Sequence, residues 1–261
     1  MTDRYLASPQ ELTLDFFYCI RAAMNHLISI GEDSLTWFGH PNRPAWREHL
    51  AFGLGNQLFF IHIETDQDEV LGPSPLEDTI RIAQLSGGIP CLMRMTKTNE
   101  GWVPENDDWN LVHALTQEPV IPTKLVTDEL IEISDWEVYD LCVEHVCRKI
   151  EEEGGTITSS DNDPDVIPSI WFDDKEGLEH FVCVFGRRLS PDFEPPESLE
   201  SDAAFLWEHC DSGFYAVVLM AGREQDYEEG FFSRPLVPMY RGDGYQMFFN
   251  GLEPISRPMT H

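Results

Sequence analysis

Residues Ser169–Val184 read SIWFDDKEGLEHFVCV. An acidic segment that contains a glycine, Asp173–Leu178, separates two short runs rich in aromatic and β-branched residues, which is the pattern of a β-hairpin with a tight turn. The second run is wholly apolar, as is typical of a strand that is buried on both faces. We therefore expect the two strands of this hairpin to form the centre of the fold.

An earlier and looser copy of the hairpin stands at Pro44–Ile63, PAWREHLAFGLGNQLFFIHI. In this copy Trp46 corresponds to Trp171, which lies 125 positions later, and the same spacing separates Met95 from Met220. Each methionine closes a run that begins with glycine and turns apolar. Similarity at a fixed spacing is the signature of a duplicated structural unit. The sequence therefore predicts a tandem repeat in which both tryptophans are mostly buried.

The length of the chain, 261 residues, is sufficient for two ordinary domains, each with its own core. We expect an N-terminal α+β repeat at residues 1–121, a linker at 122–133, and a more acidic C-terminal α+β repeat at 134–261. Each repeat should contain a helix, a hairpin, a second helix, a strand and a closing hairpin. The predicted fold class is thus α+β, built from two tandem repeats of a similar helix-hairpin-helix-strand-hairpin domain.

Hydrophobic periodicity and turn residues place these elements along the chain. In the first repeat they are a helix at 10–30, strands at 46–52 and 57–64, a helix at 76–85, a strand at 89–95, and a hairpin that pairs the region of Trp102 with 109–115. In the second repeat they are a helix at 134–153, strands at 167–172 and 180–185, a helix at 199–209, a strand at 214–221, and a hairpin within 235–252. The segments 156–164 and 190–198 are expected to be exposed loops, and Tyr240–Gly244 is expected to be a hairpin turn.

Acidic residues dominate the charge of the chain. The formal net charge is -30, and the excess is larger in the second half, because residues 1–121 carry 7 basic and 17 acidic side chains whereas residues 122–261 carry 10 and 30. Such a field repels nucleic acid and anionic lipid, and it accelerates the encounter with a basic protein. The alternative interpretation is that the acidity only keeps the protein soluble.

Other features of the sequence indicate a cytoplasmic protein. No apolar run approaches the roughly 18 to 20 residues of a membrane span, and the N-terminus lacks the pattern of a signal peptide. The six cysteines stand in periodic or apolar runs without a Cys-x-x-Cys pair, so we expect reduced core residues. Cys142 and His145 could form half of a metal site, but the sequence offers no matching pair at a familiar spacing. His62, on an apolar strand, is interpreted as a core histidine.

The order helix, hairpin, helix, strand resembles the core of the restriction-endonuclease-like, PD-(D/E)XK superfamily. The resemblance implies that an Asp near the first hairpin strand and a Glu-x-Lys motif on the second strand bind a divalent metal. Asp165 and either Asp173 or Asp174 match the first role in the second repeat.

The second part of that motif is missing from both repeats. The family's Glu and Lys would fall on Cys183 and Phe185 in the second repeat, and on Ile61 and Ile63 in the first. A hard cation needs oxygen ligands, which thiol and hydrocarbon groups cannot supply. The resemblance therefore implies a degenerate member of the superfamily that has no catalytic residues and no cofactor.

The function that we expect from the sequence is that of a non-catalytic acidic binding protein. A cytoplasmic inhibitor fits best, such as a bacterial immunity protein that neutralises a toxin domain with a basic cleft, because complementary charge gives fast association. The candidate partner-binding residues lie in acidic segments of the second repeat: Asp173, Asp174, Glu176, Glu179, Asp226, Tyr227, Glu228, Glu229 and Phe231. The alternative is a metal-dependent hydrolase or nuclease whose carboxylates cluster in three dimensions, with Asp165, Asp173, Asp174 and Glu179 at its centre.

Overall fold

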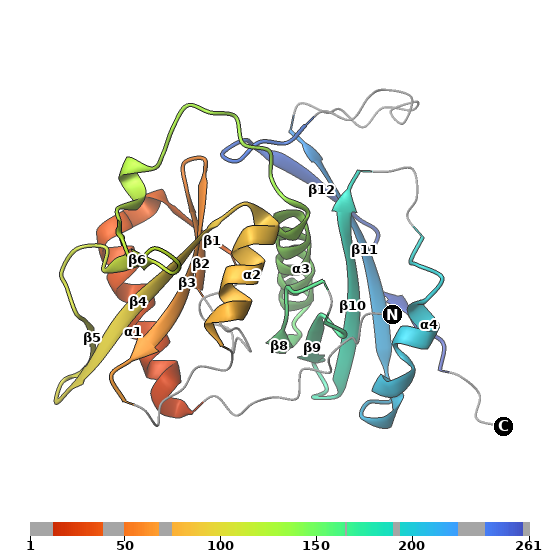
Figure 1. Cartoon of the computed structure of the whole chain (residues 1–261). Helices are drawn as coiled ribbons and strands as arrows, with labels where there is room; N and C mark the ends of the chain where they lie inside the picture. The colour runs from red at the N-terminus through yellow and green to blue at the C-terminus, as the bar shows by residue number, and fades with distance from the viewer. Residues whose placement is uncertain are drawn as a thin grey trace.

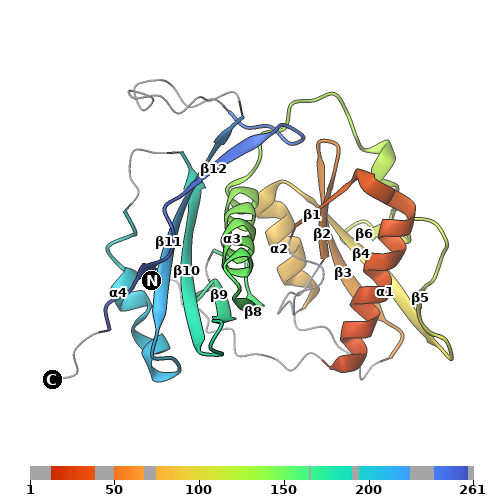
Figure 2. The same ribbon diagram turned by 180° about the vertical axis from the view of Figure 1, so that it is seen from behind.

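The computed structural model describes residues 13–38, 50–67, 75–164, 166–189, 194–223 and 238–257. These residues form two mixed β-sheets with helices packed on both faces of each sheet. Figures 1 and 2 show the two sheets standing next to each other, with helices α2 and α3 between them. The α+β class predicted from the sequence is confirmed.

The N-terminal half contains the first sheet. Its elements are α1 (Leu14–Gly31), η1 (Glu32–Ser34), β1 (Leu35–Phe38), β2 (Leu50–Leu54), β3 (Gln57–Thr65), α2 (Leu76–Ser86), β4 (Ile89–Thr98), β5 (Gly101–Pro104), β6 (Leu111–His113), β7 (Pro119–Val120) and η2 (Pro122–Lys124). The strand order is β1-β2-β3-β4-β6-β7, and β5 also pairs with β4. The pairing of β3 with β4 is parallel, because the chain crosses over between them through α2.

The C-terminal half contains the second sheet. Its elements are α3 (Asp135–Glu152), β8 (Thr156–Ser160), β9 (Ile170–Asp173), β10 (Glu179–Arg188), α4 (Leu199–Asp202), η3 (Ala204–Glu208), β11 (Gly213–Gly222), β12 (Tyr245–Phe249) and β13 (Glu253–Pro254). The strand order is β8-β9-β10-β11-β12, and β13 also pairs with β11. Here β10 and β11 are the parallel pair, and β9 and β10 form the predicted hairpin.

The long helix of each half begins at a polar residue that caps its first turn. The hydroxyl of Thr13 accepts a hydrogen bond from the amide of Phe16 in α1. In α3, the hydroxyl of Ser134 accepts from the amide of Glu137, and the Glu137 carboxylate accepts from the amide of Ser134, which is a complete capping box. Both helices have 18 residues and bury an apolar stripe against the sheet that follows them in the chain.

The helices and sheets stack in five layers. Helix α1 packs on the outer face of the first sheet, while α2 and Trp136 of α3 cover the inner face. Helix α3 packs on the inner face of the second sheet, and the short helices α4 and η3 cover part of its outer face. Trp136 lies in van der Waals contact with two rings of the first half, Phe38 and Phe60, so the halves share a packed layer.

The connection between the halves is held by hydrogen bonds at several points, although most of its side chains are exposed. The side chain of Asn56, at the tip of the β2–β3 turn, hydrogen-bonds to Thr127 and to the carbonyl of Glu129. Further along, the carbonyl of Ile131 accepts from the amide of Arg241 and the amide of Ile133 donates to Met239. The predicted linker 122–133 is therefore a connecting segment that hydrogen-bonds to both halves.

Five predictions about individual elements are wrong. Residues 156–160 form strand β8 rather than an exposed loop, and Ser159, Ser160 and Asn162 are buried beside α3, where Asn162 donates a hydrogen bond to Asp140. The region of Trp102 pairs with β4, not with 109–115, because β4 is long enough to accept β5 and β6 at different positions.

The hairpin predicted within 235–252 is not formed by the described residues 238–252, because β12 pairs with β11 and Tyr240 forms a bridge with Glu132. The predicted helix 199–209 is divided into α4 and the 3-10 helix η3. Trp171 is half-buried instead of mostly buried, since it faces the side of the sheet that these short helices cover incompletely. Its expected counterpart Trp46 lies outside the described residues, as do residues 10–12 of the first predicted helix and 46–49 of the first strand.

Candidate functional site

The acidic turn between β9 and β10 is organised by a single carboxylate. One oxygen of Asp174 accepts hydrogen bonds from the amides of Glu176 and Leu178, both at 2.9 Å, and the other lies 3.0 Å from Nε2 of His180. The hydrogen bond from His180, followed by that from the Leu178 amide, lowers the pKa of Asp174 from its ordinary value. Gly177 adopts a positive φ of 79°, which closes the turn. Asp174 thus fixes the turn, and the side chains of its neighbours point into solvent.

Two other acidic segments lie at the same end of the second sheet as this turn. Thr156, just after α3, pairs with Asp173, which brings the C-terminus of α3 beside the turn. The thiol of Cys210, after η3, donates a hydrogen bond to the carbonyl of Glu179. We call the resulting surface the acidic end; its members are Glu151, Glu152, Glu153, Asp173, Asp174, Glu176, Glu179, Glu208 and Asp211.

The acidic end has few compensating cations among the described residues. Glu152 pairs with Lys149 at 2.7 Å and with Arg148 at 3.8 Å, and Arg257 pairs with Asp211 at 2.5 Å. Lys175 lies within the turn itself and is exposed. Leu178, the last residue of the turn before β10, has 60% of its surface exposed, so an apolar side chain lies among the carboxylates.

The structure brings together four of the sequence-predicted partner-binding residues, namely Asp173, Asp174, Glu176 and Glu179. The other five, Asp226, Tyr227, Glu228, Glu229 and Phe231, lie outside the described residues. Because β10 and β11 are parallel, Arg223, which precedes that segment, stands at the opposite end of the sheet from the β9–β10 turn. The four residues of the turn therefore belong to a surface that does not include Arg223.

The residues of the alternative metal site do not form a cluster in the part of the chain that the structure describes. No three His, Cys, Asp or Glu side chains there come together in a way that could hold a metal ion. Asp165 is outside the described residues. Cys183 is 1% exposed and packs with Phe185 among the apolar residues of the outer face, and Ile61 and Ile63 are likewise buried.

Cys142 and His145, the other candidate for metal binding, face different surroundings. The thiol of Cys142 lies 3.8 Å from the carbonyl of Val218, and burial raises its pKa to about 12. Nδ1 of His145 lies 3.1 Å from a guanidinium nitrogen of Arg148. All six cysteines are buried and none is in a disulfide bond, as the sequence predicted.

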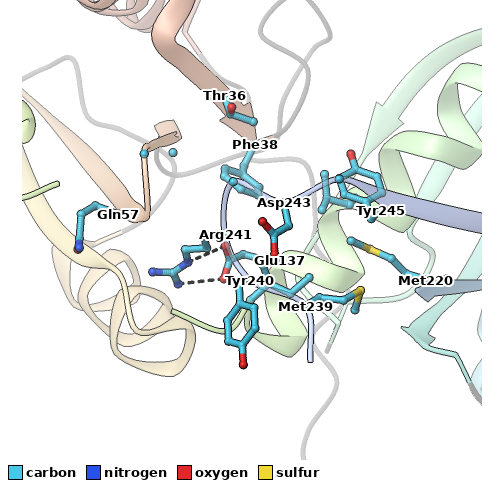
Figure 3. A pocket seen from close by; sticks show the side chains of 16 residues that line it. Thr36, Phe38, Gln57, Glu137, Met220, Met239, Tyr240, Arg241, Asp243 and Tyr245 are labelled. Carbon is cyan, nitrogen blue, oxygen red and sulfur yellow. Dashed lines mark hydrogen bonds and ion pairs between the residues drawn. The ribbon is translucent and has the colours of Figure 1, made fainter. Parts of the chain in front are cut away.

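A pocket of about 230 Å³ lies where the two halves meet the turn before β12 (Figure 3). A turn is present at Tyr240–Gly244, with the amide of Asp243 donating to the carbonyl of Tyr240 at 3.1 Å. It is not the predicted hairpin turn, because Tyr240 forms a bridge with Glu132 on one side of it and β12 pairs with β11 on the other. Phe38 from the first sheet, Glu137 from α3 and Met220 from β11 line the pocket together with this turn. We refer to it as the junction pocket.

The wall of the junction pocket is a buried ion pair between Arg241 and Glu137. Nε and Nη2 of Arg241 each donate to one carboxylate oxygen at 2.9 Å, and the two side chains are only 6% and 2% exposed. Nη2 also donates to the carbonyl of Ser86 at 2.8 Å, at the C-terminus of α2. One guanidinium therefore links the end of α2, the start of α3 and the C-terminal turn.

The pair in the junction pocket is suited to holding the halves together rather than to proton transfer. The Glu137 carboxylate is already engaged by Arg241 and by the backbone and hydroxyl of Ser134, so neither partner is available to a substrate. The sequence predicted a turn here but not this role of Arg241. The capping-box pattern Ser134-x-x-Glu137 was the signal for the glutamate; nothing local to Arg241 predicted its partner 104 positions away.

The comparisons with known proteins cover part of the chain. Residues 136–255 match a family model described as a domain of unknown function, DUF8840. This range extends from the first turn of α3 to just beyond β13, and so includes the second sheet, the β9–β10 turn and Arg241. No curated protein and no solved structure matches the chain. In the described residues no helix is both long and apolar enough to cross a membrane.

Proposed function

We propose that this protein is a non-catalytic binding protein whose acidic end engages a basic protein partner. The partner class that fits best is a toxin or effector domain with a basic cleft, so the chain would act as a cytoplasmic inhibitor or bacterial immunity protein. The observation that carries the proposal is the convergence of three acidic segments, the end of α3, the β9–β10 turn and the end of η3, on one end of the second sheet.

The chemistry of the acidic end supports binding. Closely spaced carboxylates on a protein surface produce a potential that steers a cationic partner and raises its association rate. The exposed Leu178 supplies an apolar side chain at the end of the turn, next to β10, and a few well-placed side chains carry much of the energy in protein interfaces. The turn is held rigid by Asp174, so little conformational entropy is lost when it is bound.

We also propose that the halves are tandem repeats of one degenerate, restriction-endonuclease-like domain. Both sheets contain antiparallel first and second pairings followed by a parallel pair, β3–β4 in one and β10–β11 in the other. In both halves a helix precedes the sheet and another lies in the parallel crossover. The apolar residues at the ligand positions of the superfamily favour a binding role for such a domain over hydrolysis.

Charge reversal at the acidic end tests the proposed function. The variant carries Asp173→Lys, Glu176→Lys and Glu179→Lys, and it leaves Asp174 in place to preserve the turn. The matched control carries Glu100→Lys, Asp107→Lys and Glu118→Lys, three exposed acids of the first half, so both variants change the net charge equally. A lysine-glycine dodecapeptide is the probe, and its affinity is measured by titration calorimetry.

We expect the acidic-end variant to bind the probe several kcal/mol more weakly, a typical scale for charge pairs at interfaces, and the control to be affected far less. Equal losses in the two variants would show that the acidity acts only through total charge, and the proposal would then be abandoned. Circular dichroism establishes that both variants are folded. A toxin gene next to the gene for this protein would identify the natural partner, whereas a metabolic operon would argue against the inhibitor role.

A further inference from the structure

One edge of β10 has no strand partner along its second half, in the part of the chain that the structure describes. Strand β9 pairs with β10 only from Glu179 to Val182, whereas β10 continues to Arg188. On its other side β10 pairs with β11 over the whole length from Phe181 to Arg188. About 16 Å of strand edge, from Val184 to Arg188, therefore extends past β9, at roughly 3.3 Å for each residue.

The backbone groups on this edge can be assigned from the neighbouring hydrogen bonds. The carbonyl of Val182 accepts from the amide of Ser169, and the amide of Val184 donates to the hydroxyl of Ser169 at 3.0 Å. Because backbone groups of alternate residues in a strand point to the same edge, those of Gly186 and Arg188 point the same way as those of Val184. Ser169, directly before β9, is thus the last residue that bonds to this edge of β10. The backbone donors and acceptors of Gly186 and Arg188 lie farther along the strand.

A groove of about 640 Å³ runs beside this edge. Tyr139 of α3 and the segment before β9, including Ile167, form one part of it, and residues 194–198 form another. Gly186 lets α3 approach the strand closely, since a Cβ atom there would stand 2.5 Å from Cβ of Cys142. The volume is in the usual range for ligand sites, roughly 300 to 1,000 Å³.

We propose that an extended, basic peptide segment of a partner protein binds in this groove and pairs with β10 as an added strand. A row of backbone donors and acceptors at alternate residues is matched only by another extended backbone, which is the basis of β-strand addition. The segment should be basic because Glu194 and Glu197 are exposed on the rim of the groove. At the same rim, the guanidinium of Arg187 donates a hydrogen bond to the carbonyl of Glu194. This surface lies near the end of β10 and is separate from the acidic end, which lies at its start, so the inference goes beyond the proposed function.

The test uses three seven-residue peptides that alternate lysine with valine, capped at both ends. One is unmodified, and the other two carry N-methyl groups on the lysine amides or on the valine amides, respectively. Binding is measured by fluorescence anisotropy, and the exchange of the Gly186 and Arg188 amides with deuterium is followed by NMR. Strand addition uses one edge of the peptide, so one methylated peptide should lose binding and the other should retain it.

Two variants of the protein test the rim. Glu194→Lys with Glu197→Lys should weaken binding of the unmodified peptide by about tenfold or more, whereas Glu200→Lys with Glu253→Lys, which are exposed acids outside the groove, should change it little. The peptide should also slow exchange at Gly186 and Arg188 by about tenfold or more. The proposal is overturned if these two amides exchange unchanged at saturation, or if both methylated peptides bind like the parent. Because none of these substitutions touches the acidic end, failure here leaves the test of the proposed function intact.

Discussion

The two sheets follow the same order of strand pairing but differ in what covers them. Around the first sheet, α1 lies on the outer face and the eleven-residue helix α2 fills the crossover, ending at Gly87 in the left-handed conformation. Around the second sheet, the crossover helix is reduced to four residues of α4 and five of η3, and Trp171 and the edge of β10 are left partly uncovered. The same order of strand pairing is therefore compatible with crossovers of different length, and the more open half is also the more acidic one.

The cores of the halves differ in a related way. In the first, Phe52 stacks on Phe59 with ring centroids 5.1 Å apart and on Trp109 at 6.1 Å. In the second, α3 packs through valine, cysteine and isoleucine side chains on β10 and β11. Aromatic rings fill the space under α1, whereas small side chains and Gly186 let α3 lie close to its sheet. Helix α3 is held from both sides, since it also contacts the first half through Trp136.

The largest expected effect comes from breaking the link between the halves. Arg241→Met removes the partner of a carboxylate that is 2% exposed, and an unpaired buried charge costs about 3 to 5 kcal/mol. Urea denaturation should therefore show a loss of this size in the free energy of unfolding. The control is Arg148→Met, whose partner Glu152 is exposed and 3.8 Å away, so that a loss below about 1 kcal/mol is expected. Equal losses in the two variants would mean that Arg241 is not an anchor.

A second prediction concerns a glycine that occupies the same place in each half. Gly88 precedes β4 and Gly213 begins β11, and a Cβ atom at either position would meet a phenylalanine ring, Phe60 at 2.6 Å in the first case and Phe181 in the second. Alanine at either site should destabilise the protein by about 1 to 3 kcal/mol, the usual cost of overpacking. Gly222→Ala, which has no contact closer than 3.8 Å, serves as the control. A neutral effect at only one of the two sites would show that the two halves pack differently around this glycine.

A smaller effect is expected from one partly buried histidine in each half. Burial lowers the pKa of His62 and of His145 from the ordinary value of 6.5. Below that value the unfolded chain takes up protons more readily than the folded one, so stability should fall as the pH decreases from about 7.5 to about 5.5. Asparagine in place of either histidine should flatten the dependence. If denaturation midpoints of the variants follow the same pH curve as the parent, these groups are not the cause.

The sequence was informative where the pattern is local or repeated. The two apolar runs and the turn residues of Ser169–Val184 predicted the β9–β10 hairpin, and the apolar run at Leu58–Ile63 predicted β3. The Gly-to-Met runs predicted β4 and β11, which hold equivalent places beside their parallel partners. These features are determined by residues that are close together in the chain, so they can be predicted from the pattern of a single sequence.

Other features depend on distant contacts and could not be predicted in this way. Residues 156–160 have the composition of a loop, yet their pairing with β9 and the cover of α3 make them a strand with buried serines. Four acids of the candidate site were identified because they share one turn, but the proximity of Glu151–Glu153 to them follows from the path of α3. The open edge of β10 reflects where β9 stops, which is set by Ser169.

The central claim, that the acidic end of the second half is a binding surface, is tested most directly by the salt dependence of association. Stopped-flow fluorescence gives the association rate of the labelled lysine-glycine dodecapeptide with the parent, the acidic-end variant and the first-half control. Between about 20 mM and about 500 mM salt the rate for the parent and for the control should fall by well over about tenfold, because surface charges are screened over a Debye length. The acidic-end variant should associate slowly at every salt concentration, and its association rate should depend only weakly on salt. Identical salt dependence in the acidic-end variant and the first-half control would contradict the claim.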